Sequence, residues 1–149
     1  ITFSETQGID KITQSHTSVG IRLAMAKNSS EIIFKNPIIG IGTGDFPQEY
    51  KKINQINSPK LPNSTNPHNM YILILMQLGM VGLISLLTIF YYQLQISVKS
   101  QDNSLRRIAL TLPIMFLVMM LSDSYLLGHF TTLMYVFFSS FLYKDFDKN

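Results

Sequence analysis

The sequence contains no cysteine, and only 14% of its 149 residues are charged. The absence of cysteine excludes disulfides and thiolate metal sites. The low charge, the 46% hydrophobic fraction and the mean hydropathy of +0.19 do not fit an ordinary soluble domain. These values indicate a chain that is at least partly embedded in a membrane.

The charged residues are unevenly distributed along the chain. Asn69–Val98 contains no Asp, Glu, Lys or Arg, and its length of about 30 residues exceeds the ~20 that a helix needs to cross a bilayer core. We therefore predict a transmembrane helix over 68–98. Two further apolar segments within 108–143, separated by a turn at Asp123, predict a transmembrane helical hairpin. A single re-entrant hairpin is the alternative for this region.

The polar N-terminal part of the chain carries helical signals of its own. One helix is predicted over 18–34 and ends before Pro37, because the residue preceding a proline is disfavoured in a helix. A second helix is predicted over 46–56, with Asp45 opening a capping box. We interpret 1–67 as a loop with two amphipathic helices outside the membrane.

The basic residues predict the topology. The loop 99–107 holds three basic residues and one acidic residue, and the positive-inside rule assigns such a loop to the cytoplasm. It follows that 1–67 and Asp123 lie on the outer side and the tail 144–149 in the cytoplasm. The chain has neither an initiator Met nor a signal peptide, so we expect an all-α, C-terminal fragment of a longer polytopic membrane protein. No nucleic acid partner is expected, because the basic residues are scattered.

A histidine stands at the predicted start of the first membrane helix. Asn66 suits the N-cap and Pro67 the first helical position, which would place His68 and Asn69 in the first turn, at the positive end of the helix dipole. There a neutral imidazole could accept a proton, and a phosphate would find hydrogen-bond donors. An interfacial polar residue without a chemical role is the alternative for His68.

Two glycines follow in the same predicted helix. Gly79 lies 11 residues after His68, so a continuous helix would place both on one face, with Gly82 next to them. Glycine inside a helix costs about 1 kcal/mol relative to alanine, and in membranes it allows another backbone to come close. We therefore predict that Gly79 and Gly82 pack against a neighbouring helix.

The segment "HNMYILILMQLGMVG", with His68, Asn69, Gly79 and Gly82, resembles the signature of the O-antigen ligase and polymerase superfamily of membrane glycosyltransferases. Upstream, "GIRLAMAKNSSEIIFKNPIIGIGTGDFPQEY" resembles the external loop of the same family, in which an arginine, here Arg22, opens a helix and a glycine-rich segment follows. Taken alone, the glycine-rich segment indicates a tight turn more than a phosphate site, because it lacks the Lys-Ser/Thr of a P-loop.

The resemblance implies an inverting, metal-independent transfer of a glycan from undecaprenyl diphosphate at the periplasmic face of the bacterial inner membrane. The acceptor would be the lipid A core in a ligase, another repeat unit in a polymerase, and a protein side chain in a protein O-oligosaccharyltransferase. No cofactor is implied, and the three histidines lack the spacing of metal ligands. The partners would be the lipid-linked donor, the glycan acceptor and membrane lipids.

The resemblance also implies roles for single residues. His68 would be the general base for the acceptor hydroxyl, and Arg22 would bind the diphosphate through its fork of N–H donors. Asn69 is a candidate for substrate binding. Asp123 is a second candidate on other grounds, because it is the only acidic residue within the apolar region 108–143 and acids in membrane segments are often functional. Solvated positions at a helix start and at a turn are the alternatives for Arg22 and Asp123. A polytopic transporter or non-catalytic membrane subunit is the alternative of another class, and a transporter would show broken helices and midplane charges.

Overall fold

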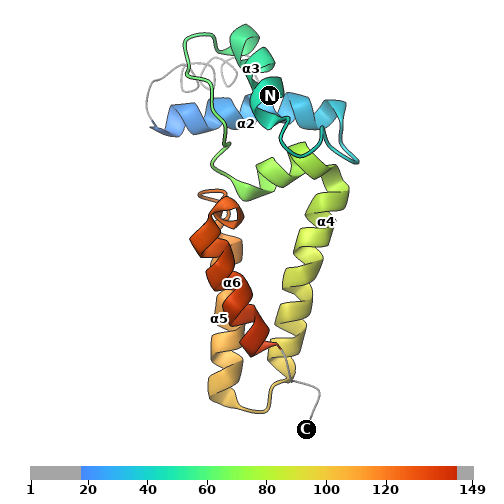
Figure 1. Cartoon of the computed structure of the whole chain (residues 1–149), viewed down its shortest axis with the longest axis vertical. Coiled ribbons are helices and arrows are strands. Elements are labelled where there is room, and N and C mark those ends of the chain that lie inside the picture. Colours follow the sequence, from blue (N-terminus) through green and yellow to red (C-terminus); the bar gives the residue numbers. More distant parts are fainter. Residues whose placement is uncertain (1–17, 144–149) are drawn as a thin grey trace, which may run out of the picture. The chain divides into compact units, whose positions relative to one another are not determined.

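A computed structural model describes residues 18–143 of the chain. This range is helical and contains no β-strand, as predicted (Figure 1). The first 17 residues of the predicted outer loop and the predicted cytoplasmic tail, 144–149, lie outside the described residues. In chain order the elements are α2 (Ser18–Lys35), α3 (Phe46–Asn57), α4 (Met70–Lys99), α5 (Asn103–Met119), the 3-10 turn η1 (Tyr125–Leu127) and α6 (His129–Leu142).

One helix of the described range, α4, is long and apolar enough to cross a membrane. The predicted hairpin region contains α5, with 17 residues, and the apolar α6, with 14, which pack against each other. Both are shorter than the ~20 residues of a full span. The architecture is that of a helical membrane protein.

The described residues form two compact units. The first consists of 18–68 together with Ile72–Gly82, and the second of Asn69–Tyr71 together with 83–143. The long helix α4 contributes residues to both units, and each unit has buried side chains of its own.

In the first unit, α2 packs on α3 through a row of asparagine side chains. Asn28 of α2 and Asn54 of α3 are fully buried, and Asn28 Nδ2 donates to Asn54 Oδ1 (3.2 Å). Asn54 Nδ2 donates to the carbonyl oxygen of Leu61 (3.0 Å), which lies in the loop that leads to α4. Because a buried amide without partners costs ~1–3 kcal/mol, these bonds fix the loop to both helices.

The helix α3 begins at Phe46, as predicted, but without the predicted capping box. Asp45 occupies the N-cap position with nearly helical dihedral angles (φ −81°, ψ −8°), and its side chain makes no capping hydrogen bond. A capping side chain normally reaches the N–H groups of the first turn from an extended backbone. The helical backbone at Asp45 therefore explains the difference.

The helix α4 is interrupted at Gly79, whose dihedral angles (φ 63°, ψ −158°) are far from helical. This region of backbone conformation is essentially restricted to glycine. The resulting bend is visible near the start of α4 (Figure 1). The prediction of one continuous helix over 68–98 is therefore wrong, and so is the argument that His68 and Gly79 share a helical face.

The glycine-rich loop 37–42, here called the sealing loop, binds the helical segment that precedes the break. Ile41 donates its N–H to the carbonyl oxygen of Met76 (2.8 Å), and Gly42 donates its N–H to the carbonyl oxygen of Gln77 (2.9 Å). The last carbonyl groups of a helical segment accept no hydrogen bond from within that segment. The sealing loop supplies donors for two of them.

The same loop binds the helical segment that follows the break. Met80 donates its N–H to the carbonyl oxygen of Pro37 (2.9 Å), and Val81 donates its N–H to the carbonyl oxygen of Ile38 (3.2 Å). The first N–H groups of a helical segment likewise have no partner within it. A break in an apolar helix is tolerated only where neighbouring groups satisfy the freed backbone, and the sealing loop meets this condition.

Two glycines permit the close approach of loop and helix. A Cβ atom on Gly79 would overlap the carbonyl group of Ile38, and one on Gly40 would lie 2.5 Å from the carbonyl oxygen of Met76. The backbone that approaches Gly79 is thus that of the sealing loop, whereas the predicted partner was a neighbouring helix. Gly82 is helical, and a Cβ atom there would meet side chains of α4 itself.

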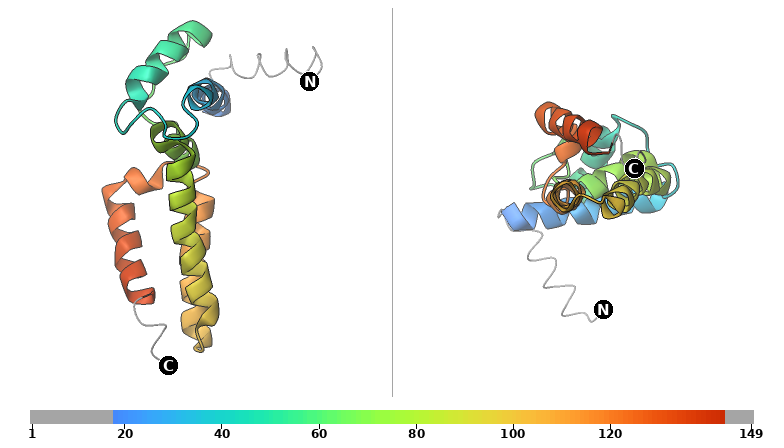
Figure 2. Two further views of the ribbon diagram at one scale, coloured as in Figure 1. Left: turned by 90° about the vertical axis from the view of Figure 1, so that its right-hand side faces the viewer. Right: turned by 90° about the horizontal axis from the view of Figure 1, so that it is seen from below.

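The second unit contains the end of α4, α5 and α6, which run side by side (Figure 2). The ring of Tyr135 in α6 lies 4.6 Å from that of Phe116 in α5 and 5.6 Å from that of Phe90 in α4, between centroids. Its hydroxyl donates to Gln93 Oε1 (2.7 Å), and Gln93 Nε2 donates to Ser139 Oγ (3.3 Å). Such polar side chains between membrane helices form hydrogen bonds across the bundle.

The helix α5 begins at Asn103, several residues before the predicted start. Asp102 caps it, because its Oδ1 accepts hydrogen bonds from the N–H groups of Ser104 (2.7 Å) and Leu105 (3.3 Å). The connection between α4 and α5 is therefore shorter than the predicted loop 99–107, and two of the basic residues of that loop lie in α5.

The close contact between Gly79 and the sealing loop leads to a prediction about stability. Gly79→Ala should destabilise the protein, because the positive-φ conformation of Gly79 costs alanine about 1–3 kcal/mol and the methyl group would displace the sealing loop. Gly44→Ala is the matched control, since Gly44 also has a positive φ (96°) but nothing lies within 4 Å of its Cβ position. We expect a clearly larger drop in melting temperature for the Gly79 variant. Equal drops would show that the loop contact contributes nothing.

Candidate functional site

His68 lies in the turn before α4, which starts two residues later. Its φ of 51° is the only positive value of a non-glycine residue in the described range, and such strained conformations cluster at functional sites. Its N–H donates to Asn66 Oδ1 (3.0 Å), and the residue is half-buried. The predicted position in the first helical turn is therefore wrong, and the helix-dipole argument does not apply to His68.

Asn66 and Pro67 are not the N-cap and first residue of α4. The Asn66 side chain accepts from the N–H two residues on, which is the bond of an Asx turn. Met70, the first residue of α4, donates its N–H to the carbonyl oxygen of Met120 (3.0 Å). A tertiary contact thus satisfies the first N–H of the helix, where the sequence predicted a side-chain cap.

Arg22 lies near the described start of α2, and its side chain is exposed. Among residues 18–143, no side chain or carbonyl group binds its guanidinium by an ion pair or hydrogen bond. The five N–H donors of the group are thus available to a ligand. The predicted approach of Arg22 to His68 stays a prediction.

Asn69 is hydrogen-bonded to the turn that follows α5, and the same turn contains Asp123. Asn69 Nδ2 donates to the carbonyl oxygen of Leu121 (3.1 Å). Asp123 lies two residues further along this turn, and its Oδ1 accepts from the N–H of Ser124 (2.7 Å). The structure therefore brings these two predicted site residues to one turn. The bond to Ser124 fits the alternative that Asp123 is a residue of the turn, and a role in substrate binding stays a prediction.

Histidines are scarce in the described part of the chain. Residues 18–143 contain no cluster of three His, Asp or Glu side chains that could hold a metal ion. The described histidines are His68 and His129, and His129 is an exposed residue at the start of α6. His68 therefore differs from His129 in being half-buried and held in a strained turn.

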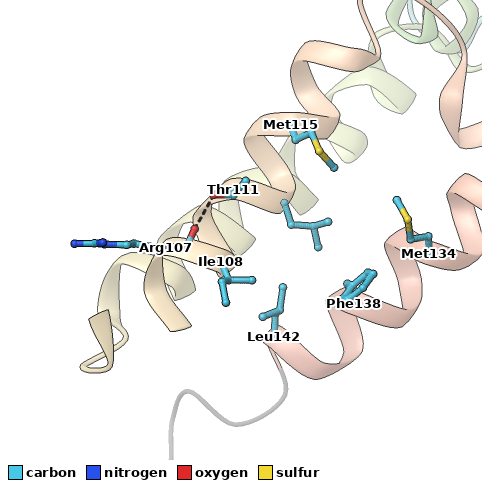
Figure 3. A pocket seen from close by; sticks show the side chains of 8 residues that line it. Arg107, Ile108, Thr111, Met115, Met134, Phe138 and Leu142 are labelled. Carbon is cyan, nitrogen blue, oxygen red and sulfur yellow. Dashed lines mark hydrogen bonds between the residues drawn. The ribbon is translucent and has the colours of Figure 1, made fainter. Parts of the chain in front are cut away.

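An apolar groove of about 430 Å³ lies between α5 and α6 (Figure 3). Met115 of α5 and Met134 and Phe138 of α6 contribute to its wall, which is almost entirely apolar. Arg107 lies at one end, and its side chain points away from the groove (Figure 3). The groove contains none of the predicted site residues, so it is not the candidate for the reaction.

Residues 2–87 match the O-antigen ligase family. The matched range covers more than half of the chain and includes Arg22, the sealing loop, His68, Gly79 and Gly82. No curated protein and no solved structure matches the chain. The family match confirms the resemblance that the two motifs indicate.

Two hydrogen bonds at the start of α4 allow an experiment that distinguishes a structural role of Asn69 from a role in substrate binding. Tyr71 OH donates to the carbonyl oxygen of Leu117 (2.7 Å), so Tyr71→Phe and Asn69→Ala each remove one hydrogen bond to a backbone carbonyl. Each should cost ~1 kcal/mol of stability. If Asn69 also binds substrate, only Asn69→Ala should lower glycan transfer per folded enzyme, by about tenfold or more. Equal transfer by the two variants would leave Asn69 a structural residue.

Proposed function

Because the chain belongs to the O-antigen ligase family, we propose that it transfers a glycan from undecaprenyl diphosphate to the lipid A core, with His68 as the general base. The family match supports glycosyl transfer of the ligase or polymerase type. The observation that carries the role of His68 is its strained, half-buried position inside the matched range. A growing repeat unit and a protein side chain are the alternative acceptors for the same chemistry.

The proposed step forms one bond and breaks one bond at the anomeric carbon of the donor. The acceptor hydroxyl oxygen attacks this carbon from the face opposite the diphosphate, so the configuration inverts. The bond from carbon to the diphosphate oxygen breaks, and the diphosphate leaves with the electron pair. His68 takes the hydroxyl proton on an imidazole nitrogen, and such general-base help is typically worth ~10²–10⁴-fold in rate.

Arg22 is proposed to bind the diphosphate of the donor. A guanidinium offers a planar fork of N–H donors to two phosphate oxygens and is charged at every physiological pH. Its exposed position on α2 keeps these donors accessible. Asn69 and Asp123 are proposed to bind substrate, since an amide and a carboxylate can both accept hydrogen bonds from sugar hydroxyls.

The proposed location is the bacterial inner membrane, with the site on the periplasmic side. Lys99, Arg106 and Arg107 lie at or near the connection between α4 and α5, which supports a cytoplasmic position for that connection. The part of α4 after Gly79 has about 20 residues, enough to cross a core of ~30 Å. The start of α4, next to His68, would then lie toward the periplasm.

The break at Gly79 bears on the transporter alternative, because transporters bind substrates and ions at broken helices. In such proteins the freed backbone groups point at the ligand. Here the sealing loop binds two carbonyl groups and two N–H groups at the break. The helix α4 also carries no charged residue before Lys99. These contacts favour a structural role for the break and support glycosyl transfer over transport.

His68→Asn tests the general base in the full-length enzyme. Asparagine tolerates a left-handed backbone, so the turn should survive, but its amide cannot take the hydroxyl proton. We expect glycan transfer to fall by ~10²–10⁴-fold, and His68→Ala to be equally inactive, with unchanged amounts of folded protein in the membrane. Near wild-type transfer by His68→Asn would show that His68 is an interfacial polar residue without a chemical role. It would also favour the alternative that the protein is a transporter.

Arg22→Lys tests the diphosphate contact, because an ammonium keeps the charge but loses the two-pronged geometry. We expect a higher KM for the lipid-linked donor at unchanged protein folding. Lys35→Ala, which removes another exposed cation of α2, is the matched control and should keep the wild-type KM. An unchanged KM in Arg22→Lys would contradict a bidentate contact.

A further inference from the structure

We propose that Asn66 is a positioning residue of the transfer reaction, which holds His68 in its left-handed turn and thereby sets the direction of the imidazole. The inference rests on the proposed role of His68 as the base. Its basis is the hydrogen bond from the N–H of His68 to Asn66 Oδ1 (3.0 Å). This bond joins the side chain of one residue to the backbone of the residue whose conformation is strained.

Asn66 is itself held by Ser64. Ser64 Oγ donates to the carbonyl oxygen of Asn66 (2.6 Å) and accepts from its N–H (3.2 Å). One hydroxyl therefore binds both backbone groups of Asn66, and the Asn66 side chain binds the N–H of His68. The three hydrogen bonds form a continuous path from Ser64 to the backbone of His68.

The strain at His68 explains why such support is needed. A left-handed backbone is unfavourable for a residue with a Cβ atom, and an intramolecular hydrogen bond to that backbone offsets part of the cost. The buried Pro67 between the two residues has a fixed φ near −65°, which reduces the freedom of the turn. Loss of the Asn66 bond would allow His68 to relax to an ordinary backbone conformation.

Relaxation at His68 would change the reaction more than the fold. A change from a left-handed to an extended backbone redirects the bond from Cα to Cβ, and with it the imidazole. A displacement of about 1 Å at a catalytic group can cost ~10²-fold in rate. Because Asn66 is inferred to orient the base and not to bind substrate, its loss should lower kcat and leave KM unchanged.

The test compares two variants of Asn66 in the full-length membrane enzyme. Asn66→Ala removes the accepting oxygen, and Asn66→Asp keeps an oxygen in the same place. For each variant, kcat is measured per folded protein at the pH where the rate no longer changes with pH. We expect Asn66→Ala to lower kcat by ~10–100-fold at unchanged KM. Asn66→Asp should restore most of the lost rate. Thr65→Ala, an exposed neighbour in the same segment, is the control and should match the wild type.

Three results would overturn the positioning role: a wild-type kcat in Asn66→Ala, a loss confined to KM, or equal losses in the Ala and Asp variants. His68→Asn, measured in parallel, separates this inference from the proposed function. An inactive His68→Asn together with a fully active Asn66→Ala would overturn the positioning role alone. An active His68→Asn would overturn both.

Discussion

Four backbone hydrogen bonds between the sealing loop and the two sides of the break in α4 are the contacts on which the first unit depends. An interrupted apolar helix leaves carbonyl and N–H groups without partners, and each costs several kcal/mol in a nonpolar surrounding. The loop binds two groups of each kind. Its close approach leaves no room for a Cβ atom at Gly40 or Gly79. Two glycine-containing segments that lie far apart in the sequence therefore act as one structural element.

This arrangement separates the structural part of the motif that begins at His68 from the part to which we assign the chemistry. Gly79 provides the break that receives the sealing loop. His68 lies outside α4, in a turn that Ser64 and Asn66 stabilise with their own hydrogen bonds. The spacing of the motif thus combines two requirements: a strained turn that carries the histidine, and a position that only glycine can occupy. The family match covers both.

The helical class was predictable from the sequence because a long run without charge has few explanations other than a membrane helix. The start of α5 at Asn103 was missed, although Asp102 before Asn-Ser-Leu is a local capping signal. The break at Gly79 was not predictable. Glycine also occurs within continuous membrane helices, and the contact with the sealing loop that accompanies the break is visible only in the structure. Asn66 suits both an N-cap and an Asx turn, and only tertiary contacts decide between them. The meeting of Asn69 with the Asp123 turn likewise depends on long-range packing.

Hydrogen exchange of single backbone amides in the full-length protein tests the sealed break most directly. Ile41 and Gly42 lie in a loop, but their N–H groups bind carbonyl oxygens of α4, so we predict exchange as slow as in the interior of that helix. The amides of Thr43 and Gly44 make no hydrogen bond within the described range and should exchange rapidly. Equally rapid exchange at all four amides would contradict the sealed break and the common role of the two glycine segments.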